Sequence, residues 1–392
     1  MTPAARIAAA AGVLDRVLEG AAAEPALIGW ARGARYAGSG DRAAVRDLVY
    51  DSLRRRGRHA LRAGLSGADD PRLSGRALMI GALAEVGQDP AALFTGEGHA
   101  PAALSEAERV GLDSGVAGGA MDDLPAWLHP LLSDALGADL PAYAEAMTRR
   151  APVWLRVNPL RGDLPTAQAA LAEDGITTTP HPACATALCV TEGARRINRS
   201  RAYLDGLVEL QDLSPQRAVA ALGDLSGQSV LDFCAGGGGK ALALAAQGAA
   251  RVVAWDAKPG RMADLPARAM RAGAAIEVAE VPKGRFDLVL ADVPCSGSGT
   301  WARDPDARWR FAPGDLAALA SVQAGILDAA LAHLTPGGRL AYMTCSVLRQ
   351  ENEDRITAFS AQTGLAIHQM QRFGPPQQGD GFFLAVLGAG PG

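Results

Sequence analysis

The stretch of residues 230–240, VLDFCAGGGGK, constrains the fold of this chain more than any other. An apolar segment that predicts a buried parallel strand runs into four consecutive glycines and then into a helix-forming run, ALALAAQ. Glycine lets the backbone turn tightly and come closer to a ligand than a side chain would allow. The free N–H groups at the start of the following helix would face the same ligand. The stretch therefore predicts a ligand-binding loop between a strand and a helix.

The spacing of this loop does not match two common glycine-rich motifs. A phosphate-binding loop in this register would need glycine at position 234 and Ser or Thr at 241, where the sequence has Cys234 and Ala241. A dinucleotide site would need a third glycine at the position of Leu242. Asp256, at the end of an expected strand, is placed to bind the ribose of any adenosine-bearing cofactor, S-adenosylmethionine included. The choice of ligand therefore depends on the rest of the chain.

Residues 223–392 alternate between strand and helix patterns, which is typical of a doubly wound α/β domain. Two polar turns, DVPCSGSGT at 292–300 and TCS at 344–346, follow two of the expected strands. Because open α/β sheets bind ligands at the carboxyl ends of their strands, we expect both turns beside the glycine loop. The expected strands cover 230–233, 251–255, 276–279, 286–291, 340–343 and 382–386, and the expected helices cover 241–247, 261–272, 315–333 and 356–362.

Two further regions precede this domain. Residues 1–125 carry apolar residues at three- and four-residue spacing, which predicts an all-helical domain, followed by a loop-rich linker over 96–125. The helices are expected at 4–20, 25–34, 41–65, 75–86 and 91–94. Residues 126–222 mix helical segments with short strand-like ones and predict a small α+β subdomain that connects the other two.

The net charge of −4 argues against a uniformly basic nucleic-acid binder, although arginines cluster at 42–62 and 195–201. Each cluster has two interpretations. It could be a solvated face, since aspartates accompany the first cluster, or a phosphate-binding patch, since guanidinium groups pair with phosphate in forked geometry.

The five cysteines are scattered, which indicates reduced thiols in a cytoplasmic protein. His181, Cys184 and Cys189 lack a second ligand pair at usable spacing, so we expect no metal site. Charged residues interrupt the apolar N-terminal stretch at helical spacing, so we expect an amphipathic helix there and no membrane segment.

Cys295 and Cys345 lie in the two polar turns, whereas a lone cysteine is more often a small buried hydrophobe. A thiolate can add to C6 of a pyrimidine, which makes C5 nucleophilic enough to attack a sulfonium methyl group. The later loss of the C5 proton and of the thiol calls for a second acid–base group nearby. A pair of cysteines suits this chemistry.

Together these motifs resemble those of the Sun-type (Fmu/NSUN) RNA cytosine-5 methyltransferases, and among them the bacterial ribosomal small-subunit RNA methyltransferase B type. Residues 35–56 are also similar to the NusB-like RNA-binding domain of that subfamily. The motifs that carry the resemblance are LRVNPLRG (155–162), LQDLSPQRA (210–218), LDFCAGGGGK (231–240), WDAKPGRM (255–262), FDLVLADVPCSGSGTWARDPDARWR (286–310), LTPGGRLAYMTCSVLRQENED (334–354) and DGFFLAVL (380–387).

The resemblance implies a Rossmann-like methyltransferase domain at 223–392, an all-α NusB-like domain with its linker at 1–125 and the connecting α+β subdomain at 126–222. It implies methylation of a cytosine C5 in RNA, most of all 16S ribosomal RNA, with S-adenosyl-L-methionine as cofactor, by a monomer. Two alternatives are a transfer RNA cytosine-5 methyltransferase and a non-catalytic RNA-binding factor of ribosome assembly. An NAD-dependent oxidoreductase is disfavoured by the missing third glycine.

The resemblance also implies roles for single residues. Cys345 matches the nucleophile, Cys295 the residue that assists product release, and Asp292 the carboxylate that binds the base beside the cofactor. Glu280 would replace the family's adenine-contacting Asp, and glycine replaces Ala-Pro in the loop CAAPGGKT. The other cofactor-binding residues would be Cys234, Ala235, Gly236, Gly237, Gly238, Gly239, Lys240, Asp256 and Arg261, with Lys240 also near the substrate. RNA contacts are expected from Arg54, Arg55, Arg56, Arg196 and Arg303.

Overall fold

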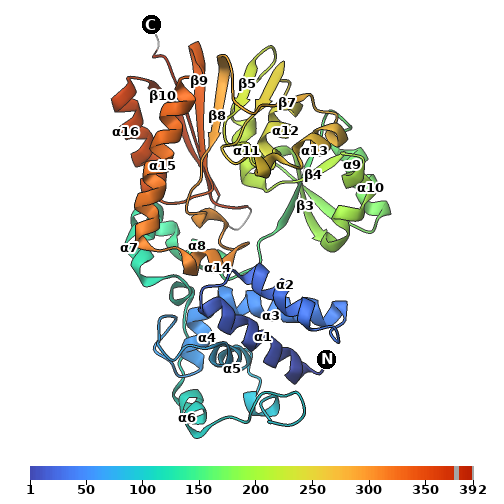
Figure 1. The fold of residues 1–392 in the computed structure, drawn as a ribbon, viewed down its shortest axis with the longest axis vertical. Helices are drawn as coiled ribbons and strands as arrows, with labels where there is room; N and C mark the ends of the chain where they lie inside the picture. The colour runs from blue at the N-terminus through green and yellow to red at the C-terminus, as the bar shows by residue number, and fades with distance from the viewer. Residues whose placement is uncertain (375–378, 391–392) are drawn as a thin grey trace. The chain divides into compact units, whose positions relative to one another are not determined.

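The computed structural model describes residues 1–374 and 379–390 (Figure 1). The chain forms two compact units. The helical unit consists of Met1–Arg150 together with Trp301–Pro313, and the α/β unit consists of Ala151–Thr300 together with Gly314–Gly392. The boundaries of these units differ from the expected boundaries after residues 125 and 222, since 126–150 pack with the N-terminal helices.

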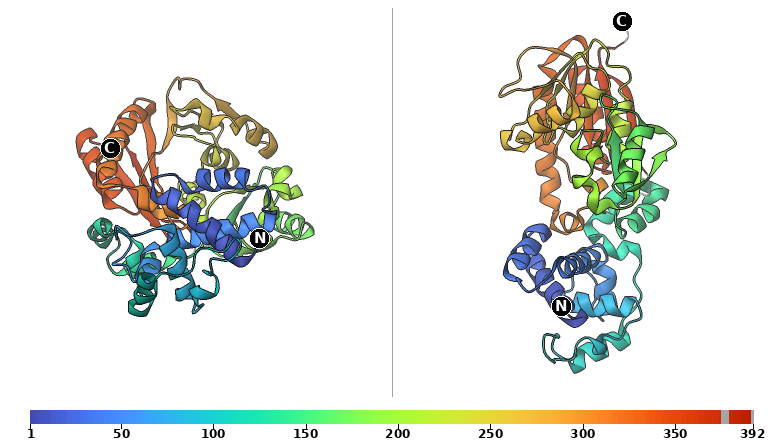
Figure 2. Two further views of the ribbon diagram at one scale, coloured as in Figure 1. Left: turned by 60° about the horizontal axis from the view of Figure 1, so that its bottom comes forward. Right: turned by 90° about the vertical axis from the view of Figure 1, so that its right-hand side faces the viewer.

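The helical unit has a core made by the apolar faces of its first helices (blue to cyan in Figures 1 and 2). Leu14, Val49 and Leu78 are completely buried in it, one from each of three helices. The helices are α1 (Pro3–Leu18), α2 (Ala23–Gly33), α3 (Ser39–Arg54), α4 (Arg56–Arg62), α5 (Gly75–Glu85), α6 (Glu106–Ser114), α7 (His129–Leu136), α8 (Leu140–Met147) and α14 (Pro305–Arg310).

Two expectations for this unit need correction. The helix expected at 41–65 is broken at Arg55 into α3 and α4, and Gly57 then lies so close to another backbone that an added Cβ would be 1.8 Å from the Asp122 carbonyl oxygen. The expected linker contains α6, whose N-terminus is capped reciprocally by Ser105 and Glu108. The Ser-x-x-Glu pattern of this capping box is present in the sequence and could have indicated the helix.

The segment 301–313 packs inside the helical unit although it follows the PCSGSG turn in the sequence. The Arg308 guanidinium is fully buried and donates to the carbonyl oxygens of Leu53 (3.1 Å) and Arg54 (2.9 Å), at the end of α3. Trp309 Nε1 donates to the same Leu53 oxygen at 2.9 Å. These carbonyls have no partner within their own helix, so a cation satisfies them well.

The α/β unit is built on a seven-stranded sheet with the order β10-β11-β9-β8-β5-β6-β7. Its central strands pair in parallel, while β11 pairs antiparallel with both β9 and β10. The strands are β5 (Ser229–Asp232), β6 (Arg251–Ala254), β7 (Ile276–Val278), β8 (Phe286–Asp292), β9 (Leu334–Thr344), β10 (Ala366–Phe373) and β11 (Phe382–Gly388). The Rossmann-like α/β prediction is confirmed, although β10 was not foreseen.

Helices cover both faces of this sheet, which is why its strands are apolar on both sides. Val230, Leu288 and Ala341 face a core shared with α11 (Leu213–Ala220), α12 (Gly239–Ala246) and α13 (Leu265–Ala272). Their neighbours Leu231, Val289 and Tyr342 face the opposite core, shared with α15 (Pro313–Leu331) and α16 (Glu353–Thr363).

A second, antiparallel sheet in the same unit has the order β2-β3-β1-β4. Its strands are β1 (Val153–Val157), β2 (Thr177–His181), β3 (Cys184–Glu192) and β4 (Val208–Leu210), and helices α9 (Leu164–Glu173) and α10 (Arg201–Leu204) accompany them. Its core is centred on the buried Leu155, Leu171 and Leu188. The arrangement is α+β.

One helix in the described part of the chain, α15, is long and apolar enough to cross a membrane by length and composition. Its Leu327 and Ala330 are buried against the sheet, and Gln323 donates to the Pro294 carbonyl oxygen at 3.0 Å. The helix is therefore part of the folded α/β unit.

We expect Arg308→Ala to lower the free energy of unfolding of the helical unit by about 3 kcal/mol, because it removes buried charge-assisted hydrogen bonds and leaves a cavity. Arg310→Ala in the same helix is the matched control, since the Arg310 side chain is 44% exposed and its buried partner Asp306 (3.1 Å) keeps the hydrogen bond from the Ala23 N–H. We expect this variant to lose only about 1 kcal/mol. Denaturant titration followed by circular dichroism measures both. Equal shifts for the two variants would contradict the structural role of Arg308.

Candidate active site

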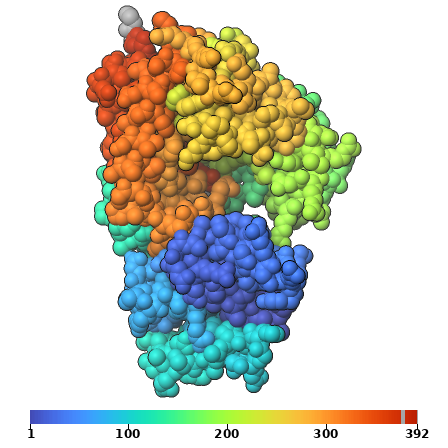
Figure 3. Space-filling view, viewed as in Figure 1, coloured from blue at the N-terminus to red at the C-terminus, as the bar shows by residue number. Residues whose placement is uncertain are grey.

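A cavity of about 810 Å³ opens at the carboxyl ends of four strands of the large sheet. It is lined by residues that follow β5, β6, β8 and β9, and by one face of α15. Figure 3 shows α15 (orange) and the segment after β6 (yellow) as neighbouring parts of one surface. The lining residues are Phe233, Cys234, Trp255, Asp256, Ala257, Lys258, Arg261, Asp292, Val293, Pro294, Cys295, Leu319, Val322, Gly325, Ile326, Ala329 and Cys345.

The glycine loop follows β5 and bends in a way that only glycine allows without strain. Gly236 and Gly238 have φ angles of +52° and +81°, in the left-handed region that other residues avoid. A Cβ on Gly238 would also lie 2.1 Å from a methyl carbon of Leu265. The loop is tied to the next strand, since Ala235 N–H donates to the Trp255 carbonyl oxygen at 2.9 Å.

Asp256 is buried at the end of β6 and holds this loop in place. Its carboxylate accepts hydrogen bonds from the Gly236 N–H (2.9 Å), the Lys258 N–H (2.9 Å) and Arg261 Nη1 (3.0 Å). A carboxylate offers about four lone-pair positions, so one acceptor position remains for a ligand hydroxyl. Asp256 and Arg261 both line the cavity, beside the aromatic pair Phe233 and Trp255, whose ring centroids are 4.6 Å apart.

Lys240 and Asp292 form an ion pair between the first turn of α12 and the end of β8. Lys240 Nζ lies 2.5 Å from Asp292 Oδ2, and the lysine side chain is 16% exposed. Burial lowers the pKa of Lys240, but the attraction of Asp292 outweighs it, so the pKa is raised overall and the amine stays charged. Behind the pair, complete burial raises the pKa of Asp232 to about 7, against the attraction of Lys240.

The two cysteines come together although 49 residues separate them in the sequence. Cys295 Sγ and Cys345 Sγ are 3.4 Å apart, and both thiols are free and partly exposed. The Gly299 N–H donates to the Cys345 carbonyl oxygen at 2.9 Å, which connects the two turns. The hydrogen bond to the Cys345 sulfur, together with burial, raises the pKa of Cys295 well above its usual range. At this separation one of the two sulfurs can donate a hydrogen bond to the other.

Some residues of this site were not foreseen from the sequence. The apolar face of α15, with Leu319, Val322 and Ile326, closes one side of the cavity. The fully buried Glu351 binds both cysteine turns. Helical periodicity could have indicated the α15 face, but nothing in the local sequence shows that Glu351 is buried.

Glu280, which was expected to contact the adenine of the cofactor, does not line the cavity in the described residues. It is exposed, and its backbone carbonyl accepts a hydrogen bond from Trp255 Nε1 at 3.1 Å. Its side chain is absent from the cavity lining within the described residues. The structure therefore gives no support to a contact between Glu280 and an adenine.

The arginines expected to contact RNA divide into two groups. Arg54 Nε donates to the Ala302 carbonyl oxygen (3.1 Å), and Arg56 donates to the Ala68 carbonyl oxygen (2.9 Å). Arg56 also stacks on the Trp309 ring at 4.7 Å. Both thus act within the helical unit, which favours the structural interpretation for them. Arg55 is half-buried and forms a long ion pair with Asp51 (3.6 Å), whereas Arg196 and Arg303 are exposed. Arg196 Nη1 also donates to the carbonyl oxygens of Asp174 (3.4 Å) and Gly175 (3.5 Å).

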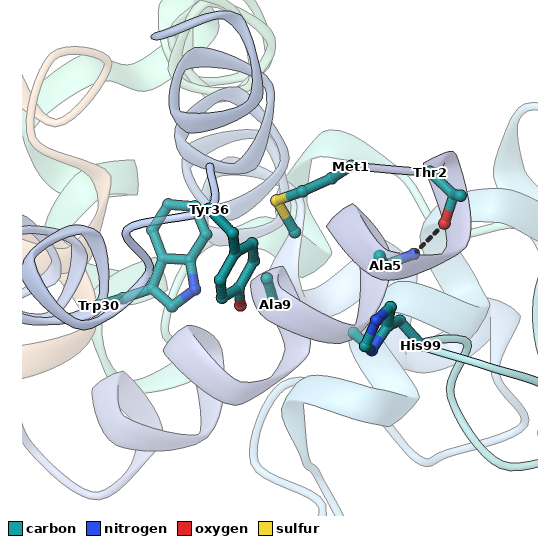
Figure 4. Close-up of a pocket in the computed structure, with 8 residues that line it drawn as sticks. Met1, Thr2, Ala5, Ala9, Trp30, Tyr36 and His99 are labelled. Atoms are coloured by element: carbon teal, nitrogen blue, oxygen red, sulfur yellow. Dashed lines mark hydrogen bonds between the residues drawn. The ribbon is translucent and has the colours of Figure 1, made fainter. Parts of the chain in front are cut away.

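A second cavity of about 780 Å³ lies in the helical unit (Figure 4). Trp30 and Tyr36 lie next to each other on one side of it, near Met1, and His99 lies beside Ala5. Its described lining contains neither carboxylates nor thiols, and its polar side chains are those of Thr2, Tyr36 and His99, with the indole of Trp30. The described residues also contain no cluster of three or more potential metal ligands.

Two family models match the chain. The 16S rRNA methyltransferase RsmB/F model covers residues 219–388, and a model of the ferredoxin-like domain of RsmF/B-like methyltransferases covers residues 124–197. Ribosomal RNA small subunit methyltransferase B of Vibrio cholerae is 35% identical over 283 residues, which are 67% of this chain and 64% of that protein. The protein of that name from Citrobacter koseri is 34% identical over 282 residues, 67% of this chain and 66% of that protein. The matched part thus spans slightly less than two thirds of these relatives.

Solved structures agree on the fold. The structure of PH0851 superposes with a TM-score of 0.75 over 99% of both chains at 21% identity. The structure of NSun6 from Pyrococcus horikoshii superposes with a TM-score of 0.60 over 67% of this chain and 98% of that one, at 17% identity. The family matches lead to one assignment: over residues 124–197 and 219–388 this chain belongs to the RsmB/F family of methyltransferases.

Proposed function

We propose that this protein methylates C5 of a cytosine in RNA, most of all in 16S ribosomal RNA, through a covalent bond between Cys345 and C6 of the base. The observation that carries the proposal is the pair of free thiols 3.4 Å apart in a cavity at the carboxyl ends of parallel strands. A methyl transfer to oxygen or nitrogen would need no thiol. Two thiols suit a carbon nucleophile that must be activated and later released.

Cys345 would act as the nucleophile. Its thiolate adds to C6, and electron density moves to C5, which then attacks the methyl group. A hydrogen bond from Cys295, whose sulfur lies 3.4 Å away, would stabilise the Cys345 thiolate before attack. After transfer, a general base would take the C5 proton, and the electron pair of that C–H bond would restore the C5–C6 double bond and expel Cys345 as a thiolate. Cys295 lies against the leaving sulfur and is placed to assist this elimination.

Asp292 and Lys240 would bind the cytosine and support its activation. The carboxylate at the end of β8 lines the cavity next to Cys295, so it can accept a hydrogen bond from the base. Lys240 Nζ lies 2.5 Å from that carboxylate and holds it in place. The pair thus orients the base while the thiolate approaches its C6 atom.

The glycine loop and Asp256 would hold S-adenosylmethionine. The site fits such a cofactor, because Asp256 lines the cavity next to the glycine loop that it holds and has an acceptor position left for a ribose hydroxyl. When bound, S-adenosylmethionine supplies an electrophilic methyl group on a sulfonium. The aromatic pair Phe233–Trp255 and the apolar face of α15 would exclude water around it.

The helical unit would bind RNA as a NusB-like domain, which favours ribosomal over transfer RNA as the substrate. With Arg54 and Arg56 engaged internally, the phosphate contacts would come from the half-buried Arg55 and the exposed Arg303 of this unit, together with the exposed Arg196 of the α/β unit. We further propose that the protein acts as a cytoplasmic monomer. Transfer of labelled methyl groups to unmodified 16S ribosomal RNA, compared with unmodified transfer RNA, tests the substrate.

We expect Cys295→Ala to accumulate a covalent RNA adduct, because the nucleophile still attacks but the product cannot leave. On a denaturing gel of protein expressed in cells, this variant should show a slowly migrating band that nuclease removes. Wild type and Cys345→Ala should lack it. A band in Cys345→Ala alone would reverse the roles of the two cysteines, and methyl transfer by the Cys345→Ala protein would refute the covalent mechanism.

We expect Gly238→Ala to weaken binding of S-adenosylmethionine by at least about 10²-fold, because a side chain at a positive φ and 2.1 Å from Leu265 must displace the loop. Gly260→Ala is the control, since Gly260 has open space around its Cα and no positive φ. Isothermal titration calorimetry measures both affinities. Unchanged binding by Gly238→Ala would place the cofactor elsewhere.

A further inference from the structure

We propose that Glu351 is a positioning residue that clamps the two cysteine turns together and so sets the separation of the two thiols. Glu351 ends a short 3-10 helix (Arg349–Glu351) after β9 and is completely buried. It lies behind the cavity and is not among the residues that line it in the described chain. The inference rests on the proposed function, since it concerns the geometry of the same two cysteines.

Four hydrogen bonds converge on the Glu351 carboxylate. One oxygen accepts from the Ser296 N–H (2.8 Å) and from Gln323 Nε2 (3.1 Å). The other accepts from the hydroxyls of Ser296 and Ser346, each at 2.5 Å. Ser296 directly follows Cys295 and Ser346 directly follows Cys345. A single buried side chain therefore binds the neighbour of each thiol.

The backbone of Glu351 is fixed as firmly as its side chain. The Tyr342 hydroxyl donates to the Glu351 carbonyl oxygen at 2.6 Å. The next residue, Asn352, accepts from the Thr344 hydroxyl (2.6 Å) and donates to the Ser346 carbonyl oxygen (2.9 Å). Glu351 is thus anchored to the end of β9, so a shift of Glu351 would also shift the Cys345 turn.

The chemistry of the clamp requires a carboxylate. All four partners are donors, and an ionised carboxylate is a pure acceptor with about four positions for them. An amide in its place would turn its NH₂ group either towards the Ser296 N–H and Gln323 Nε2, which donate in the clamp, or towards the two hydroxyls, which would then have to accept instead of donate. Charge-assisted hydrogen bonds are also about twice as strong as neutral ones. The carboxylate thus holds both turns more firmly than an amide of the same shape.

The charge of Glu351 also acts on the thiol beside it. After Cys345 and burial, the Glu351 carboxylate is a further cause that raises the pKa of Cys295. The other titratable groups near the pair are Tyr342, Asp292 and Lys240. Removal of the Glu351 charge should therefore move the titration of Cys295 to lower pH.

The variant Glu351→Gln tests the inference, with Glu353→Gln as the matched control. Glu353 lies two residues further on, and its carboxylate pairs with Arg372 at 2.6 Å. Arg372 donates separately to the Val347 carbonyl oxygen (2.8 Å), a bond that the substitution leaves in place. We expect Glu351→Gln to lower kcat for RNA methylation on the order of 10²-fold through misplaced thiols, with S-adenosylmethionine affinity unchanged. Glu353→Gln should retain the wild-type kcat.

A second measurement is independent of methyl transfer. In a Cys345→Ala background, the pH midpoint for alkylation of Cys295 by iodoacetamide should fall when Glu351→Gln is added, and stay when Glu353→Gln is added. With both thiols present, oxidation by diamide should form the Cys295–Cys345 disulfide more slowly in Glu351→Gln. A residue that merely supported the fold would leave the midpoint where it was.

Wild-type kcat, midpoint and disulfide rate in a folded Glu351→Gln protein would overturn the inference. If that variant fails to fold, Ser296→Ala and Ser346→Ala each remove one hydroxyl of the clamp and should each slow disulfide formation; no effect from either would overturn it as well. Failure of the proposed function would show differently, as a wild type without methyl transfer, while the thiol measurements would still report on Glu351.

Discussion

Hydrogen bonding between the parallel strands β5, β8 and β9 is the constraint on which the candidate active site depends. Both faces of β8 are apolar, so the hydrophobic pattern alone does not fix its register. Polar groups at the two ends of β8 fix this register. Asp287 accepts from the Ser229 N–H and hydroxyl, both at 2.8 Å, and Asp292 pairs with Lys240. A slip by one residue would move Asp292 by about 3.3 Å along the strand, away from both the lysine and the thiols.

The same sheet explains the electrostatics of the site. The strand ends bring Asp232, Asp292 and the two thiols into one region that is partly shielded from water. Burial there favours the neutral forms of these acids and thiols. Lys240 offsets the charge of Asp292, and the hydrogen bond to Cys345, together with burial, raises the pKa of Cys295. The proposed reaction would use one thiolate of the pair, with the second cysteine beside it.

Features that follow from local sequence were predicted, whereas contacts that depend on packing were not. The strand after Arg285, the glycine loop and the turns with Cys295 and Cys345 follow from local pattern, and the structure has them where they were expected. The contacts of the arginines do not follow from local pattern. A guanidinium on a helix surface and one that binds a carbonyl of another segment look alike in sequence, and Arg54 and Arg56 are of the second kind. Their partners, Ala302 and Ala68, could not be chosen without the tertiary fold.

The sequence by itself determined the α/β architecture, the loop at 234–240 and the set of reactive side chains, because periodicity, glycine content and strand ends are local properties. Only the tertiary structure decided that the thiols lie 3.4 Å apart, that the segment 301–313 packs among the N-terminal helices, and that Glu351 is buried between two turns. These facts depend on contacts between residues far apart in the chain. Such contacts form only when the whole core closes, and no short stretch of sequence records them.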